Sequence, residues 1–170
     1  MGNTVTDLMV ANALGLAEQH LRAEGRIVPM FYFSGPGGEA VLRLDLTPEK
    51  DRADLFQKAR LMAAALAAEA CAWVCEARLE EPGEPAQSFV AIFCESRGGD
   101  AALFAHANGT GADACLVPFD SPLTRTAGGD GPSPLSAYIH RAAGESDPGE
   151  AWRRLEAMGV SRSDSRRALN

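Results

Sequence analysis

The chain has little lysine, few aromatic residues and no long hydrophobic run. Only two of its 16 basic residues are lysine, Lys50 and Lys58, and alanine is abundant. We interpret this as the codon bias of a GC-rich bacterial genome. No apolar segment approaches the roughly 20 residues of a membrane-spanning helix, and no secretory signal pattern is present. The sequence therefore predicts a bacterial, cytoplasmic protein that does not contact membranes.

Cysteine is also scarce, and its spacing argues against metal binding. The four cysteines contain no C-x-x-C pair. Cys71 and Cys75 fall on a predicted strand, where four residues separate two thiols by roughly 13 Å, too far apart to share one zinc ion. We expect reduced, buried thiols, with neither a cofactor nor a metal ion.

Charge is unevenly distributed along the 170 residues, whose formal net charge is −7. Up to Ala107 there are 9 basic and 15 acidic residues, whereas from Ala151 onward five arginines face only Glu156 and Asp164. An acidic body repels phosphate backbones. Nucleic acid is therefore a possible partner only through the basic tail.

The hydrophobic period changes along the chain in an order that predicts the fold. A helical stripe of Val10, Leu14, Ala17 and Leu21 comes first and ends at Gly25. It is followed by two alternating segments at residues 27–33 and 40–46 and by a second helical stripe at residues 47–70. Three further alternating segments come last, at residues 71–80, 88–97 and 100–107. We expect an α+β fold with an antiparallel sheet in the order α-β-β-α-β-β-β. This order resembles the roadblock/longin type of scaffold, which implies a docking or dimerisation module.

Two glycine-rich segments predict hairpin turns. Residues 35–38 predict a four-residue loop, and Gly98-Gly99 predicts a two-residue turn. The first segment resembles a phosphate-binding loop in composition. It joins two strands, however, and not a strand to a helix, so we interpret it as a hairpin turn.

The sequence predicts three regions. Residues 1–119 form a compact α/β domain, residues 120–134 a Pro/Gly-rich linker or loop, and residues 135–170 a short helical tail. In this tail, Asp147 and Glu150 have the spacing of a helix cap, with Pro148 at the first helical position and Gly159 at the stop.

Our first functional hypothesis is a non-enzymatic protein-interaction or regulatory module, because the predicted domain contains no catalytic set. Its partner is another protein or a second copy of the chain. An exposed sheet face and the tryptophan-containing tail helix form the predicted surface, although a solvated face without a partner fits the sheet residues equally well. The predicted residues are Tyr32, Arg43, Asp45, Glu76, Arg78, Trp152, Leu155 and Met158.

The second hypothesis concerns DNA. Residues 152–170 resemble the helix-turn-helix of LacI-type repressors, with a short helix, a Gly-Val-Ser turn and a second helix. The resemblance implies a DNA-binding regulator with Arg162, Ser163 and Arg166 at the groove. The same residues also resemble the Met-Gly turn of ubiquitin-associated domains. A helical pair packed on the body or on a partner is the alternative.

The third hypothesis is a small enzyme or metal protein centred on His106. Glu76, Glu95, Asp113 and Cys115 are its candidate companions. No further ligand has a convincing spacing, so a histidine near a strand end is the simpler interpretation.

Overall fold

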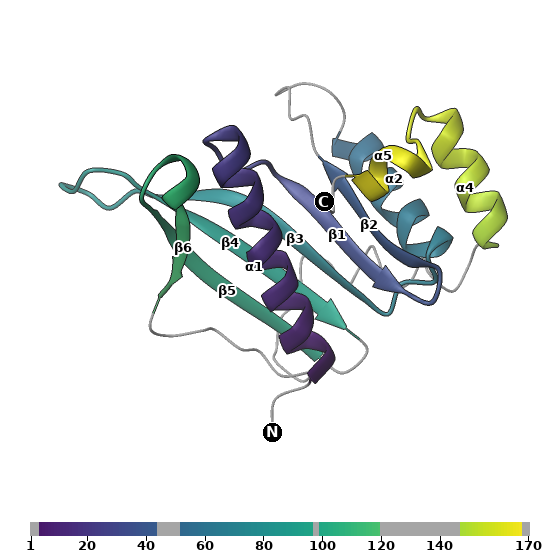
Figure 1. Ribbon diagram of the computed structural model, residues 1–170, viewed down its shortest axis with the longest axis horizontal. Coiled ribbons are helices and arrows are strands. Elements are labelled where there is room, and N and C mark those ends of the chain that lie inside the picture. The colour runs from purple at the N-terminus through teal and green to yellow at the C-terminus, as the bar shows by residue number, and fades with distance from the viewer. Residues whose placement is uncertain (1–3, 44–51, 97–98, 120–146, 168–170) are drawn as a thin grey trace.

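The computed structural model describes residues 4–43, 52–96, 99–119 and 147–167 (Figure 1). The helices are α1 (Thr4–Glu24), α2 (Arg52–Ala65), α4 (Pro148–Ala157) and α5 (Arg162–Arg167), with a short 3-10 helix, η1 (Gly111–Asp113). The strands are β1 (Met30–Gly35), β2 (Gly38–Arg43), β3 (Ala70–Leu79), β4 (Gln87–Ser96), β5 (Gly99–Asn108) and β6 (Cys115–Pro118).

The six strands form one sheet in the order β2-β1-β3-β4-β5-β6. Every neighbouring pair is antiparallel. The segment that contains α2 connects β2 to β3, and β3 then pairs with β1 on the side away from β2. The structure confirms the predicted α+β fold and its antiparallel sheet.

Helix α1 covers one face of the sheet, over β3, β4 and β5 (Figure 1). Its buried side includes Met9, Ala13 and Ala17. Ala17 and Leu21 of the predicted stripe are buried, whereas Val10 and Leu14 are only half-buried at its margin. Small side chains at Ala13 and Ala17 leave room for the helix to approach the sheet closely.

The second layer lies on the opposite face, at the β1–β2 end of the sheet. Phe31 and Phe33 are fully buried there in one cluster with Met62 of α2. Helix α4 packs against α2 and adds Trp152 and Leu155 to the same cluster. In Figure 1, both helices lie at this end of the molecule, away from β5 and β6.

The first hairpin is tighter than predicted. Gly35 pairs with Gly38, so the connection has two residues in place of four. The Gly37 N–H donates a hydrogen bond to the Leu66 carbonyl oxygen at 2.9 Å. A Cβ atom on Gly37 would lie 2.8 Å from Leu66 Cα. These glycines therefore let the hairpin approach the end of α2, which supports the interpretation as a turn.

Gly99, predicted to lie in the second turn, is instead paired with Ser96 as the first residue of β5. Residues 97–98 lie outside the described residues. Strand β2 is described to Arg43, and residues 44–51 of the predicted second strand and helix also lie outside the described residues.

The last part of the chain begins as the sequence predicts. The Asp147 carboxylate accepts a hydrogen bond from the Glu150 N–H at 3.0 Å, and Pro148 is the first residue of α4. The helix ends just before Gly159, which has a φ of +84°. The predicted linker, residues 120–134, and residues 135–146 lie outside the described residues, so the predicted division into three regions stays a prediction.

Candidate functional site

Aromatic side chains form one connected row across the sheet face opposite α1. Neighbouring ring centroids are between 5.7 and 6.2 Å apart, as is typical of interacting aromatic pairs. We call this row the aromatic ladder. In spatial order it consists of Phe31, Trp73, Phe93, Phe104, Phe89 and Phe119.

Strand register explains why these residues meet. Phe31 lies opposite Trp73, and Trp73 lies opposite Phe93, so three rings stand side by side on β1, β3 and β4. Phe104 on β5 is diagonal to Phe93, a position within reach of large side chains. Phe119 donates its backbone N–H to the Phe104 carbonyl oxygen, which brings its ring to the same edge of the sheet.

Exposure increases along the aromatic ladder. Phe31 is fully buried beneath α2, whereas Trp73 and Phe93 are half-buried. At the other end, Phe119 is 43% exposed, and the ring of the exposed His106 lies 5.6 Å from it. The hydrophobic core thus continues outward, past the helices described on this face, to the β6 edge.

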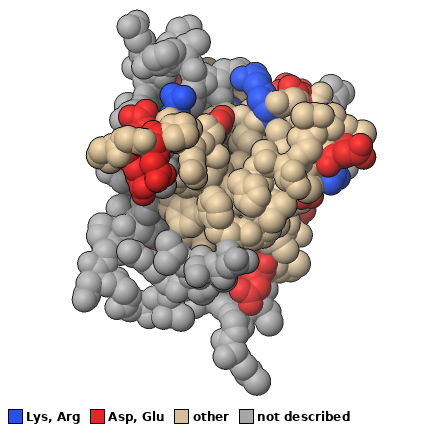
Figure 2. Space-filling view, turned by 90° about the vertical axis from the view of Figure 1, so that its left-hand side faces the viewer, with Lys and Arg blue, Asp and Glu red and all other residues tan. Residues whose placement is uncertain are grey.

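The β6 edge of the molecule is almost free of charge. Asp113 is the only charged residue between Asp100 and Asp120. Figure 2, which views this side, shows a broad uncharged surface in its middle, with both acidic and basic side chains near its margins. The exposed end of the aromatic ladder therefore lies in a surface with little charge.

In the described part of the sheet, the ladder's face carries two charged strand residues, and both are acidic. Glu95 on β4 lies directly opposite Asp100 on β5. Glu95 is only 4% exposed. Burial, together with the negative charge of Asp100, raises the pKa of Glu95 to about 7. This end of the face is therefore sensitive to pH near neutrality.

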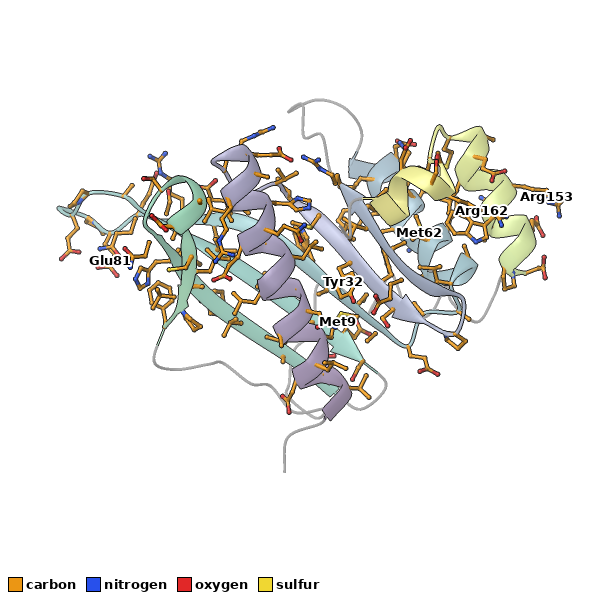
Figure 3. The ribbon with its side chains drawn as sticks, viewed as in Figure 1. Met9, Tyr32, Met62, Glu81, Arg153 and Arg162 are labelled. Carbon is orange, nitrogen blue, oxygen red and sulfur yellow. The ribbon has the colours of Figure 1, made fainter. Side chains whose placement is uncertain are left out.

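Tyr32 does not lie on an exposed sheet face, as the sequence had suggested. It lies on the face that α1 covers and is 3% exposed (Figure 3). Its hydroxyl donates a hydrogen bond to Glu39 at 2.8 Å. Burial and the Glu39 carboxylate raise the pKa of Tyr32 to about 12. Tyr32 is thus a core residue in this structure.

The charged members of the predicted surface are more exposed. Arg43 forms an ion pair with Glu24 at the end of α1. Glu76 and Arg78 are exposed on β3, and Asp45 lies outside the described residues. None of the three described residues belongs to the aromatic ladder's face, because their positions alternate with those that face it.

The predicted tail surface faces inward. Trp152 and Leu155 are buried against α2, and the half-buried Met158 packs on the same cluster. The apolar side of α4 is therefore used within the chain, as in the alternative of a helical pair packed on the body.

Arg162 is likewise held within the tail. Its guanidinium lies 4.7 Å from the centre of the Trp152 ring, and its Nε lies 3.4 Å from the Glu156 carboxylate. Ser163 is exposed, and its hydroxyl is hydrogen-bonded to Ser161. Arg166 belongs to α5, but its side chain lies outside the described part.

The structure brings together only part of the set in the His106 hypothesis. Cys115 on β6 is diagonal to His106, because His106 pairs with Val117, whereas the two glutamates lie elsewhere. Glu95 pairs with Asp100, six residues before His106 on β5, which is about 20 Å along a strand. Glu76 lies on the other face of the sheet. Within the described residues, no three His, Cys, Asp or Glu side chains are close enough to hold a metal ion.

Comparisons with known proteins give no family for the chain, because no protein-family model, curated protein or solved structure matches it. The likeness to roadblock/longin scaffolds therefore stays one of element order. None of the described helices combines the length and apolar character that crossing a membrane requires.

Sequence reasoning missed the exposed end of the aromatic ladder. Phe104 was included in a predicted strand but given no role, and Phe119 lies after Ala107, where the hydrophobic pattern weakens. The available signal was the uncharged segment from Ala101 to Ala112, which is unusual for a sheet edge.

Proposed function

We propose that this protein is an interaction module that binds a partner polypeptide on the exposed end of the aromatic ladder. The observation that carries this proposal is the continuity of the ladder, from the fully buried Phe31 to Phe119 with 43% of its surface exposed. This surface replaces the sheet residues and the α4 helix that the sequence favoured.

Aromatic residues suit a protein interface. Rings supply a large apolar contact area at a low cost in side-chain entropy, and they are enriched at the centres of protein interfaces. Phe89 and Phe104 are half-buried and in contact with each other, and the Phe89 ring also contacts Phe119. These contacts hold the rings in place before a partner binds. A preorganised surface loses less entropy on binding.

Other ligand classes fit this surface less well. Asp100, the more exposed of the two charged residues on this sheet face, is acidic, which disfavours nucleic acid and anionic lipid. The β5 and β6 side chains beside Phe119 are mostly apolar and do not converge as polar groups around a small ligand. A polypeptide with apolar side chains is the remaining class that matches.

The experiment compares two exposed apolar positions on opposite faces. Phe119→Ser changes the ladder, whereas Leu8→Ser changes α1, where Leu8 is 62% exposed. Each tagged full-length variant is expressed in the native cells, and captured proteins are quantified against the wild type by mass spectrometry. We expect Phe119→Ser to reduce capture of a specific protein by about tenfold, equivalent to about 1.4 kcal/mol, while Leu8→Ser leaves it unchanged.

Two results would overturn the proposal. The first is equal capture by the wild type and Phe119→Ser, with both variants folded by circular dichroism. The second is an effect of Leu8→Ser as large as that of Phe119→Ser. If the captured protein is a second copy of this chain, light scattering will show dimers that Phe119→Ser dissociates, and the surface then serves self-association.

A further inference from the structure

The connection between β3 and β4 places a group of carboxylates beside the exposed end of the aromatic ladder. Glu80, Glu81 and Glu84 are all exposed. They form no ion pair with any described residue. This connection leads into β4 shortly before Phe89, which contacts Phe119. Figure 3 shows Glu81 at the extreme end of the molecule on this side.

Acidic side chains therefore lie on two sides of the aromatic ladder, beyond the two ends of β4. Glu95 and Asp100 lie on the same face beyond Phe93, and the three exposed glutamates lie beyond Phe89. The nearest described arginine on β3, Arg78, belongs to the opposite face, because it alternates with the inward positions. The ladder's face is thus apolar in the middle and negative at its margins.

We propose that the partner segment is basic, with lysine or arginine residues flanking apolar side chains that contact Phe119 and its neighbours. This inference rests on the proposed function and adds the chemistry of the partner. Opposite charges at the margin of an interface accelerate association and reject partners of the wrong sign. A second copy of this chain would instead bring a surface with the same acidic margins.

The test uses a random peptide display library on the full-length protein. The library is first depleted on Phe119→Ser and then selected on the wild type. We expect the enriched peptides to combine net positive charge with apolar or aromatic residues. Enrichment of neutral or acidic peptides, or no enrichment over Phe119→Ser, would overturn the inference.

The strongest enriched peptide is then synthesised, and its affinity is measured by fluorescence anisotropy at about 25 mM and about 300 mM salt. The triple variant Glu80→Gln, Glu81→Gln, Glu84→Gln should bind about tenfold more weakly at low salt and lose most of the salt dependence. A matched triple variant, Glu69→Gln, Glu150→Gln, Asp164→Asn, removes the same charge from exposed positions elsewhere. It should stay within about twofold of the wild type.

Equal weakening by the two triple variants would overturn the inference, because net charge alone would then explain the preference. The proposed function is judged separately, by capture of a native partner with Phe119→Ser. If the wild type captures a native partner without net positive charge and Phe119→Ser does not, the proposed function is supported and the basic-partner inference is overturned.

Discussion

Glu18 of α1 accepts a hydrogen bond from the backbone N–H of Leu116 in β6 at 2.8 Å. One turn later, Arg22 donates to the Ala114 carbonyl oxygen at 2.7 Å. Pro118, at the other end of β6, has no N–H to offer. These three features satisfy or remove backbone groups at a sheet edge that otherwise lacks charge. The edge is therefore protected against pairing with another strand, and the neighbouring aromatic face is the open apolar element.

Glu18→Ala should expose the Leu116 N–H at this edge. We expect the free energy of unfolding to fall by about 1.5–3 kcal/mol, as for the loss of a hydrogen bond to a charged group. Self-association, measured by analytical ultracentrifugation, should rise. Gln19→Ala, at the neighbouring exposed position on α1, is the control and should change neither property. An unchanged sedimentation profile for Glu18→Ala would show that this contact does not protect the edge.

Trp152→Ala should destabilise the whole chain, because Trp152 is buried against α2, in the cluster that α2 and α4 share with the sheet. We expect a loss of about 3–5 kcal/mol in urea unfolding, in a single transition. Arg153→Ala, at an exposed position on the same helix, is the control. The sequence interpretation instead placed Trp152 on a partner-binding surface of a separate tail, in which case the α/β body would be unaffected. An unchanged unfolding transition would support that interpretation and contradict the packing described above.

Two glycine substitutions should have effects of opposite sign. In Gly37→Ala, the new methyl group would lie 2.8 Å from the Leu66 backbone, so we expect a loss of about 1–3 kcal/mol. In Gly15→Ala, nothing lies within 4 Å of the new methyl group. Because Gly15 is inside α1, stability should rise by about 0.5–1 kcal/mol. Thermal unfolding measures both, and equal effects would contradict the close approach at Gly37.

Glu95 should make stability depend on pH. Its pKa rises from 4.5 to about 7 on folding, because the carboxyl is buried beside Asp100. Between these values the unfolded chain ionises first, so the free energy of unfolding falls as pH rises, by about 3 kcal/mol in total. Above pH 7 this contribution is lost completely. Urea unfolding from pH 4 to pH 8 should show a flatter profile for Glu95→Gln, and parallel profiles would refute the assignment.

The order of elements was predictable because each element carries its own period. Cys75, Ala77 and Leu79 alternate with charged residues, and β3 runs through all three. The helix cap at Asp147 was equally predictable, since it depends only on nearby residues. Such signals are local, and they do not depend on what packs against the element.

Packing partners were not predictable in the same way. Tyr32 belongs to β1, a strand with large apolar or aromatic residues on both of its faces. Its side chain is buried only because α1 covers that face of the sheet. From the sequence alone, Trp152 is a reasonable interface residue, but in the structure it is buried against α2. The ladder joins Phe89 to Phe119 across a separation of 30 residues, a relationship set by strand register. Tertiary arrangement, which no single segment encodes, determines each of these cases.

The most direct test of the aromatic surface is a photo-cross-link from position 119. A benzoylphenylalanine residue replaces Phe119 in full-length protein produced in the native cells, and the same residue replaces Leu8 as the control. Our account predicts a discrete cross-linked protein from position 119 that is absent from position 8 and is lost when excess wild-type protein competes. Cross-links only within the same chain, or the same products from both positions, would contradict it.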